Sequence, residues 1–226
     1  MSATNQLSHS EENYLKAVYA LTPADNPDGI STSDIAERLN TKASSVTDMV
    51  QKLAEKELLN YKKYQGVQLT DTGKRAAVEV VRKHRLWETF LKEKLGFGWD
   101  EVHEIAEQLE HIQSEELIER LDRFLGFPKY DPHGDPIPDP SGKIQTGSSQ
   151  PISELKVGER GVITGVRDSS ASFLQYLDKQ RLILGTEVIV IEFFEYDQSV
   201  KIKAGGKEIT ISYEVSKNIK VQLQQS

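Results

Sequence analysis

Apolar residues near the start of the chain recur at the three- and four-residue spacing of an α-helix. Between residues 8 and 21 the periodic positions are Tyr14, Leu15, Val18, Tyr19 and Leu21. A capping region with Ser8 and Ser10 precedes them, and Glu11 and Glu12 fall in the first turn, where negative charge favours a helix N-terminus. This pattern predicts a first helix.

Two shorter helical patterns, Thr32 to Leu39 and Ala43 to Lys56, follow and are separated only by Asn40, Thr41 and Lys42. Two helices joined by so tight a turn indicate a helix-turn-helix. The next stretch, Leu58 to Leu69, is rich in Tyr and Val around Gln65-Gly66, which predicts a two-stranded ribbon with a tight turn. A helix pair followed by such a ribbon is typical of a winged helix.

Two longer patterns then predict a second, all-helical unit. The first covers Thr72 to Leu95, and the second is expected as one continuous helix with Asp100 as N-cap and Gly126 as stop. The second helix carries an apolar stripe, which we interpret either as a dimer interface or as intramolecular core. Its residues are Ile105, Leu109, Ile112, Leu117 and Leu121.

The pattern changes at Phe127 to Ser153, where several prolines, glycines and serines predict a linker or an extended strap. Short β-rich blocks follow, with one helical insert at Ser170 to Leu182, and indicate a small barrel of the SH3-like kind. The blocks are Val162-Ile163, Glu187 to Phe194, Val200 to Ala204, Glu208 to Ser212 and Ile219 to Leu223. The predicted fold is therefore multidomain and mainly α, with an N-terminal winged helix-turn-helix, a central helical domain and a C-terminal SH3-like small β-barrel.

Composition narrows the classes of protein. The 226 residues have room for two or three domains, and 28 basic against 35 acidic residues (net charge -7) exclude a uniformly phosphate-binding surface but permit a local basic face. With no cysteine, any metal site must use nitrogen and oxygen ligands. Without an apolar run of about 20 residues or a signal-peptide pattern, we expect a cytoplasmic protein with no membrane partner.

Histidines and carboxylates gather on the two long helical patterns. His103, Glu107, Glu110 and His111 lie at offsets of zero, four, seven and eight, which places them on one helical face. His84 and Glu88 are four residues apart on the preceding helix. These residue types could bind one or two divalent ions. The alternative is a solvated acidic face, and only the repetition across two helices argues against it.

The winged helix indicates DNA binding, because the second helix of such a pair enters the major groove with its N-terminal end. The hydroxyl groups there suit phosphate at a helix N-terminus, and nearby lysines supply positive charge. The candidate residues are Lys42, Ser44, Ser45, Thr47, Asp48 and Lys52, with Lys62 and Lys63 in the wing. Asp48 either accepts from a cytosine or pairs with a lysine. The alternative is a unit that contacts only protein.

At this point the chain resembles the diphtheria toxin repressor family of metal-dependent transcription regulators, with its iron-dependent and manganese-responsive branches, over nearly its whole length. The motifs are ENYLKAVY at 12–19, SDIAERL at 33–39, SSVT at 44–47, LTDTGK at 69–74, RKHRL at 82–86, ExxEH at 107–111 and GDPIP at 134–138. The resemblance implies a winged helix at 1–74, a helical metal-binding and dimerisation domain at 75–140, a linker at 141–152 and an SH3-like (FeoA-like) barrel at 153–226.

The resemblance also implies ligand sets. The primary metal site would use Asn13, Glu107, Glu110 and His111, and the ancillary site His84, Glu88 and His103. Asp168 lies in the barrel stretch that lends ligands in iron-type members; here it is either a ligand or the N-cap of the helix after it. Glu107 and Asn13 replace the cysteine and methionine of iron-responsive members, so the set favours Mn(II) over softer-ligand choices, with Fe(II) also possible. Lys16 would repel a second ion.

The function that follows is a non-enzymatic, metal-dependent repressor that binds palindromic double-stranded DNA operators as a homodimer, with Mn(II) or Fe(II) as co-repressor, and controls metal homeostasis. Two alternatives stay open. One is a di-metal hydrolase or oxidase, since paired helices with Glu and His also build such sites. The other is a winged-helix regulator that metal does not control.

Overall fold

The computed structural model describes residues 6–22, 29–62, 66–145 and 147–224. The chain forms two compact units. The first comprises residues 1–84, 109–114 and 138–143, and the second comprises residues 85–108, 115–137 and 144–226. No helix among the described residues is long and apolar enough to span a membrane.

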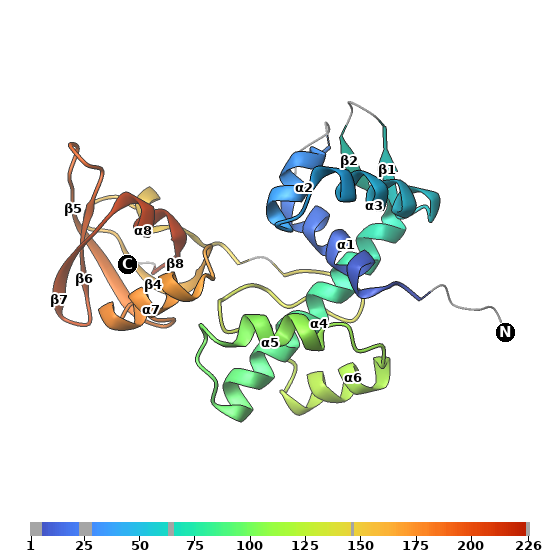
Figure 1. The fold of residues 1–226 in the computed structure, drawn as a ribbon. Helices are drawn as coiled ribbons and strands as arrows, with labels where there is room; N and C mark the ends of the chain where they lie inside the picture. Colours follow the sequence, from blue (N-terminus) through green and yellow to red (C-terminus); the bar gives the residue numbers. More distant parts are fainter. Residues whose placement is uncertain (1–5, 23–28, 63–65, 146, 225–226) are drawn as a thin grey trace. The chain divides into compact units, whose positions relative to one another are not determined.

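The winged helix forms most of the first unit (Figure 1). It contains α1 (His9–Leu21), α2 (Thr32–Arg38), α3 (Ala43–Glu55), β1 (Leu59–Tyr61) and β2 (Val67–Leu69). Ser8 and Glu11 form a reciprocal capping box that starts α1. Strands β1 and β2 pair antiparallel, with Leu59 opposite Leu69. The predicted elements are confirmed within one or two residues, whereas the tip of the wing, including Lys63, lies outside the described residues.

Helix α4 (Asp71–Leu95) begins directly after the wing and contributes to both units. Gly73 allows its first turn to pack closely on the chain before β1, since a Cβ at this position would lie 1.9 Å from the carbonyl oxygen of Leu58. The first unit takes α4 as far as His84, so the histidine-bearing part of this helix is fixed to the winged helix.

The predicted continuous helix from Asp100 to Gly126 is wrong. The structure has α5 (Val102–Leu109) and α6 (Glu115–Phe124), and the intervening residues 110–114 belong to the first unit. Ser114 followed by Glu115 and Glu116 is a helix-start pattern that the periodicity obscured. Because of this break, the apolar stripe does not lie along one helix, and Leu121 is buried.

The proline-rich segment is an ordered strap over much of its length. Arg82 donates to the carbonyl oxygen of Pro138 within the first unit, and Arg85 donates to that of Pro136 within the second. The region expected as a linker, 141–152, already contains the first strand of the barrel, β3 (Gln150–Pro151), which pairs with β8.

The C-terminal domain is a six-stranded antiparallel sheet in the order β3-β8-β4-β5-β6-β7. The further strands are β4 (Arg160–Val166), β5 (Glu187–Phe193), β6 (Val200–Ala204), β7 (Lys207–Ile211) and β8 (Ile219–Leu223). Helix α7 (Ala171–Gln180) is the predicted insert, while the 3-10 turn η1 (Ile152–Glu154) and α8 (Tyr213–Asn218) were not predicted. The core of this domain includes Trp99, which precedes α5 in the chain.

Candidate metal centre

The first group of candidate ligands lies within the first unit. His111 is buried, and its Nδ1 lies 2.5 Å from Oε2 of Glu12 on α1. Since a carboxylate accepts, this contact puts the proton on Nδ1 and leaves Nε2 with its lone pair. Nε2 lies 4.0 Å from Oε1 of Glu110. A histidine oriented by a carboxylate through its other nitrogen is the usual arrangement around a bound metal ion.

Glu110 gives the clearest sign that an ion fits here. Its side chain is 1 % exposed, and its buried Oε1 has no hydrogen-bond partner among the described residues. An unpaired buried carboxylate oxygen is costly. Two ligand atoms 4.0 Å apart can both reach one ion at bond lengths of about 2.0–2.2 Å. Glu110 Oε1 and His111 Nε2 therefore suit a divalent cation.

The other oxygen of Glu110 is already occupied. Oε2 lies 2.6 Å from Nδ1 of His84 and 2.7 Å from Nζ of Lys16. Burial raises the pKa of Glu110, but the hydrogen bond from His84 and the positive charge of Lys16 outweigh it, so the pKa is lowered overall. Glu110 is thus an ionised carboxylate with one oxygen bound to a lysine and the other available.

Asn13, which the resemblance adds to this group, and Glu107, which helical spacing already suggests, are both exposed. Glu107 lies on α5 with Oε1 3.5 Å from Nε2 of His103. Glu12 was missed by the sequence analysis, which assigned it only to the first turn of α1. Its spacing could have revealed it, because Glu12 is three residues before the fully buried Leu15 and so lies on the apolar face of the helix.

A second group of candidate ligands lies within the second unit and centres on Glu88 of α4. Its Oε1 is 3.1 Å from Nδ1 of His103, and its Oε2 is 3.4 Å from Nδ1 of His133. Ligand atoms of Glu88, Asp131 and His133 all lie within 4.8 Å of one another, and all three residues are buried. His84 lies one helical turn before Glu88 on α4.

His133 is held for ligation in the same way as His111. Its Nε2 donates to the carbonyl oxygen of Trp99 at 2.7 Å, which leaves Nδ1 facing Glu88. The main chain of the turn is also fixed, because Asp131 Oδ1 accepts from the backbone N–H of His133, and the His133 carbonyl accepts from that of Val166 on β4. Nδ1 of His133 therefore has a defined direction toward the carboxylates.

The negative charges of the second group raise the pKa values of two of its members, and the same charges would attract a cation. Burial, together with the negative charges of Glu88 and Asp135, raises the pKa of Asp131 to about 7. Hydrogen bonds to Glu107 and Glu88 raise the pKa of His103 to about 9 against the effect of burial. Arg85 lies 3.5 Å from Asp131 and offsets part of this negative charge, and a bound divalent cation would favour the ionised form of Asp131 further. The sequence analysis missed Asp131 and His133 because it assigned their segment to a linker.

Asp168 has a local role in the structure. Its Oδ1 accepts from the backbone N–H of Ser170 at 2.8 Å, directly before α7. The expected N-cap role is wrong, because Ser170 is the N-cap of α7 and Asp168 forms a turn just before it.

The candidate DNA-binding residues lie mostly on the surface of the first unit. Lys42, Ser44, Ser45, Asp48, Lys52 and Lys62 are exposed. Lys42, the N-cap residue of α3, makes no side-chain capping hydrogen bond, and the first turn of α3 carries no acidic residue, so its backbone N–H groups suit phosphate. The hydroxyl of Thr47 donates to the carbonyl of Ala43, and Lys52 lies 3.1 Å from Glu11 with about half of its side chain exposed.

Comparison with known families identifies three successive regions. Residues 6–67 match the N-terminal DNA-binding domain of iron-dependent repressors, and residues 70–139 match their metal-binding and dimerisation domain. Residues 150–223 match the FeoA domain. The predicted order of winged helix, helical domain and small barrel is thereby confirmed.

Individual relatives agree with these matches. The chain is 35 % identical to the iron-dependent repressor IdeR of Mycobacterium tuberculosis over 145 residues, 63 % of this chain and 60 % of that protein. It is 31 % identical to the diphtheria toxin repressor of Corynebacterium jeikeium over 72 % of this chain and 68 % of the relative. A solved manganese-dependent transcriptional repressor in complex with manganese superposes with a TM-score of 0.86 at 34 % identity, covering 95 % of this chain and 100 % of that one.

Proposed function

The chain belongs to the diphtheria toxin repressor family of metal-dependent regulators, and from this premise we propose that it is a DNA-binding repressor activated by Mn(II) or Fe(II). It binds operator DNA as a homodimer and performs no catalysis of its own. The proposal rests above all on the contact between Glu12 and His111. Glu12 lies in the DNA-binding region and His111 in the metal-binding region, so one imidazole joins the two.

We infer that metal affinity and DNA affinity are linked through this imidazole. A divalent ion at His111 Nε2 would add positive charge to the ring and make Nδ1–H a stronger donor to Glu12. The stronger hydrogen bond would hold α1, and with it the winged helix, in one arrangement. Linkage of about 1–3 kcal/mol, the usual allosteric range, changes DNA occupancy about 5- to 150-fold.

Ligand chemistry supports Mn(II) and Fe(II). Glu110 and His111 supply carboxylate oxygen and imidazole nitrogen, and the sequence contains no cysteine that would select a softer metal. We propose Asn13 and Glu107 as further ligands of this first ion, drawn in from the exposed positions they occupy in the structure. We also propose a second ion at Glu88, Asp131 and His133, with His103 alongside.

We propose that DNA contacts come from α3 and the wing. The uncapped start of α3 offers backbone N–H groups to a phosphate, and Ser44 and Ser45 are exposed beside it. Lys42, Lys52 and Lys62 add positive charge to a chain that is acidic overall. Lys63 extends this set in the part of the wing outside the described residues.

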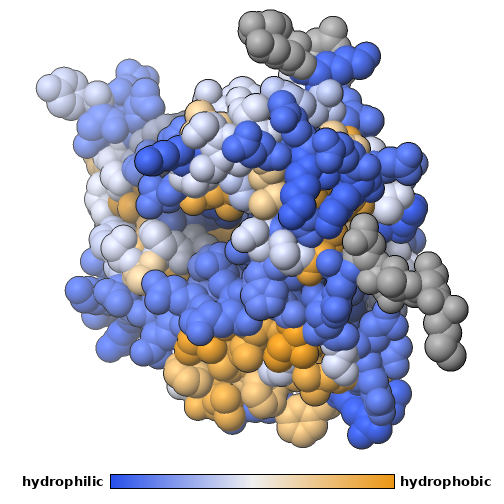
Figure 2. Space-filling model, turned by 45° about the vertical axis from the view of Figure 1, so that its right-hand side comes forward, coloured by the Kyte–Doolittle hydropathy of each residue, from blue (hydrophilic) through white to orange (hydrophobic). Residues whose placement is uncertain are grey.

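We propose that the dimer forms through the apolar surface of the helical part of the second unit. Figure 2 shows a hydrophobic patch on one face of the molecule. The exposed large apolar side chains of this helical part are Leu95, Phe97, Leu117, Phe124 and Phe127. Large apolar side chains left exposed are typical of a protein interface. Phe124→Glu should give monomers in sedimentation experiments, and an unchanged dimer would contradict this assignment.

The test of the function is fluorescence anisotropy of labelled palindromic DNA selected from a random pool. The protein is titrated in chelator, in Mn(II), and in Fe(II) without oxygen. We expect tight binding only with metal, and its loss in Glu110→Ala and His111→Ala. Equal binding in chelator would support a regulator that metal does not control. Metal-dependent hydrolysis or oxidation of a substrate panel would support the enzyme alternative.

A further inference from the structure

Two lysines lie within the first group of candidate ligands. Nζ of Lys16 is 2.7 Å from Glu110 Oε2, and Nζ of Lys83 is 3.5 Å from Glu12 Oε1. The side chain of Lys16 is 18 % exposed and that of Lys83 only 4 %. Lysine is almost never buried to this extent without a charged partner, so both ammonium groups belong to the group's electrostatics.

Each buried carboxylate of this group is paired with a lysine without a metal ion. Glu12 and Glu110 are two buried carboxylates, and Lys16 and Lys83 are two ammonium groups in contact with them. A buried carboxylate without a counter-charge strongly destabilises a protein. The two lysines therefore remove a penalty that the metal-free protein would otherwise carry.

The same lysines act against metal binding. Glu110 offers Oε1 to an ion while Lys16 holds Oε2, so the ion and the ammonium group share one carboxylate. Lys83 similarly reduces the negative charge of Glu12, the carboxylate that orients His111. Like charges this close repel, and the repulsion is little screened in a buried site.

We propose that Lys16 and Lys83 are tethered counter-cations that set the metal affinity of this site. They neutralise Glu110 and Glu12 when no ion is bound, so the metal-free protein is stable, and they lower the affinity for an ion that binds the same carboxylates. The inference rests on the proposed function and adds to it the residues that determine the metal concentration at which the repressor responds.

The test compares Lys16→Met and Lys83→Met with Lys56→Met as a matched control. Lys56 is another largely buried lysine of the first unit, and its Nζ lies 2.6 Å from the buried Glu11, which is not a candidate ligand. All variants are made in a His133→Ala background, so that the second group does not contribute. Mn(II) affinity is measured by calorimetry, and the unfolding temperature is measured in chelator.

We expect all three substitutions to lower the unfolding temperature in chelator, because each removes an ammonium group from a buried carboxylate. Lys16→Met and Lys83→Met should also bind Mn(II) at least about ten-fold more tightly, whereas Lys56→Met should stay within about two-fold of its parent. If either methionine variant fails to fold, the glutamine variant at that position, which keeps a hydrogen-bond donor, is measured instead.

Unchanged or weaker Mn(II) binding in both lysine variants would overturn the inference and leave the proposed function intact. Equal tightening in Lys56→Met would also overturn it, because the effect would then be one of overall charge. Absence of Mn(II) binding in the His133→Ala parent would overturn the proposed metal site together with the inference.

Discussion

Glu12 and Glu11 are neighbouring buried carboxylates on α1 with different partners. Glu12 accepts from Nδ1 of His111, whereas Glu11 binds Lys52, Lys56 and the backbone N–H of Ser8. Burial raises the pKa of Glu11, but its lysine and backbone partners prevail and hold this pKa at about 2. One carboxylate therefore orients a candidate ligand, and the other joins α1 to α3.

This difference predicts the effect of removing each charge. Glu12→Gln keeps an acceptor for His111 but loses the charge that makes the imidazole a better ligand, so Mn(II) affinity should fall by about 10- to 100-fold. Glu11→Gln should lower the free energy of unfolding and leave Mn(II) affinity unchanged. Calorimetry and urea unfolding measure the two quantities. Equal loss of affinity in both variants would show that the fold of α1, rather than His111, is what matters.

At the residue scale, the sequence was most informative where candidate ligands share a helix. The pair of His103 and Glu107 follows from four-residue spacing alone. Spacing did not reveal Glu12, Asp131 and His133 as candidate ligands, because their partners are distant in the chain. His111, for example, is 99 residues from Glu12. Spacing within one element cannot reveal such contacts, although burial predicted from apolar periodicity would have flagged Glu12.

At the scale of elements, helices with clear caps were predicted closely and the break after α5 was not. Residues 110–114 leave the helical path because Glu110 and His111 make their contacts in the first unit. The four offsets that suggested one helical face therefore describe two separate groups, with His103 and Glu107 on α5 and Glu110 and His111 beyond its end. Tertiary contacts outweighed local propensity there.

The turn that carries Asp131 and His133 gives a second prediction. Gly134 has φ +81°, and a Cβ there would lie 2.0 Å from the carbonyl oxygen of Thr164 on β4. Gly134→Ala should therefore displace the turn from the barrel and abolish Mn(II) binding by the second group. Gly126→Ala is the matched control, because Gly126 has φ +76° but no atom within 4 Å of the added Cβ.

Both variants introduce a similar backbone strain, and only Gly134→Ala adds a steric clash. Mn(II) binding is measured by calorimetry in a Glu110→Ala background, which leaves the second group alone. Retained binding in Gly134→Ala would mean that the turn does not need the barrel. Loss of binding in Gly126→Ala as well would point to general destabilisation of the second unit.

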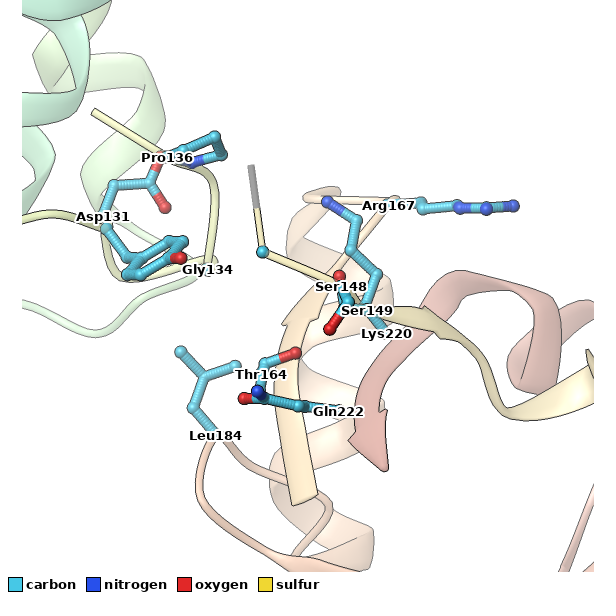
Figure 3. Close-up of a pocket in the computed structure, with 12 residues that line it drawn as sticks. Asp131, Gly134, Pro136, Ser148, Ser149, Thr164, Arg167, Leu184, Lys220 and Gln222 are labelled. Atoms are coloured by element: carbon cyan, nitrogen blue, oxygen red, sulfur yellow. The ribbon is translucent and has the colours of Figure 1, made fainter. Parts of the chain in front are cut away.

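At the scale of the whole molecule, the barrel supports the second group through Trp99 and through the turn at His133 and Gly134. Trp99 contributes its indole to the barrel core and donates through Nε1 to Asp178 on α7, while its carbonyl accepts from His133. Figure 3 shows Asp131, Gly134 and Pro136 on one side of a pocket of about 420 Å³ and Thr164, Lys220 and Gln222 of the barrel on the other. Sequence patterns predicted the barrel but not this support, which depends on a single tryptophan and one tight turn.

This arrangement predicts that an ion in the second group stabilises the barrel. An ion on His133 Nδ1 would restrain the residue whose carbonyl accepts from Val166 of β4, so opening of β4 would require release of the ion. A ligand at 100 times its dissociation constant stabilises the bound state by about 2.7 kcal/mol, which is about 100-fold slower hydrogen exchange. We therefore expect the backbone amides of β4, Val166 among them, to exchange about 100-fold more slowly in saturating Mn(II) than in chelator.

Two variants test the origin of this protection. His133→Ala should remove it and Glu110→Ala should retain it, because of these two residues only His133 is hydrogen-bonded to the barrel. Equal protection in both variants would place the effect in the protein's overall stability rather than in this turn.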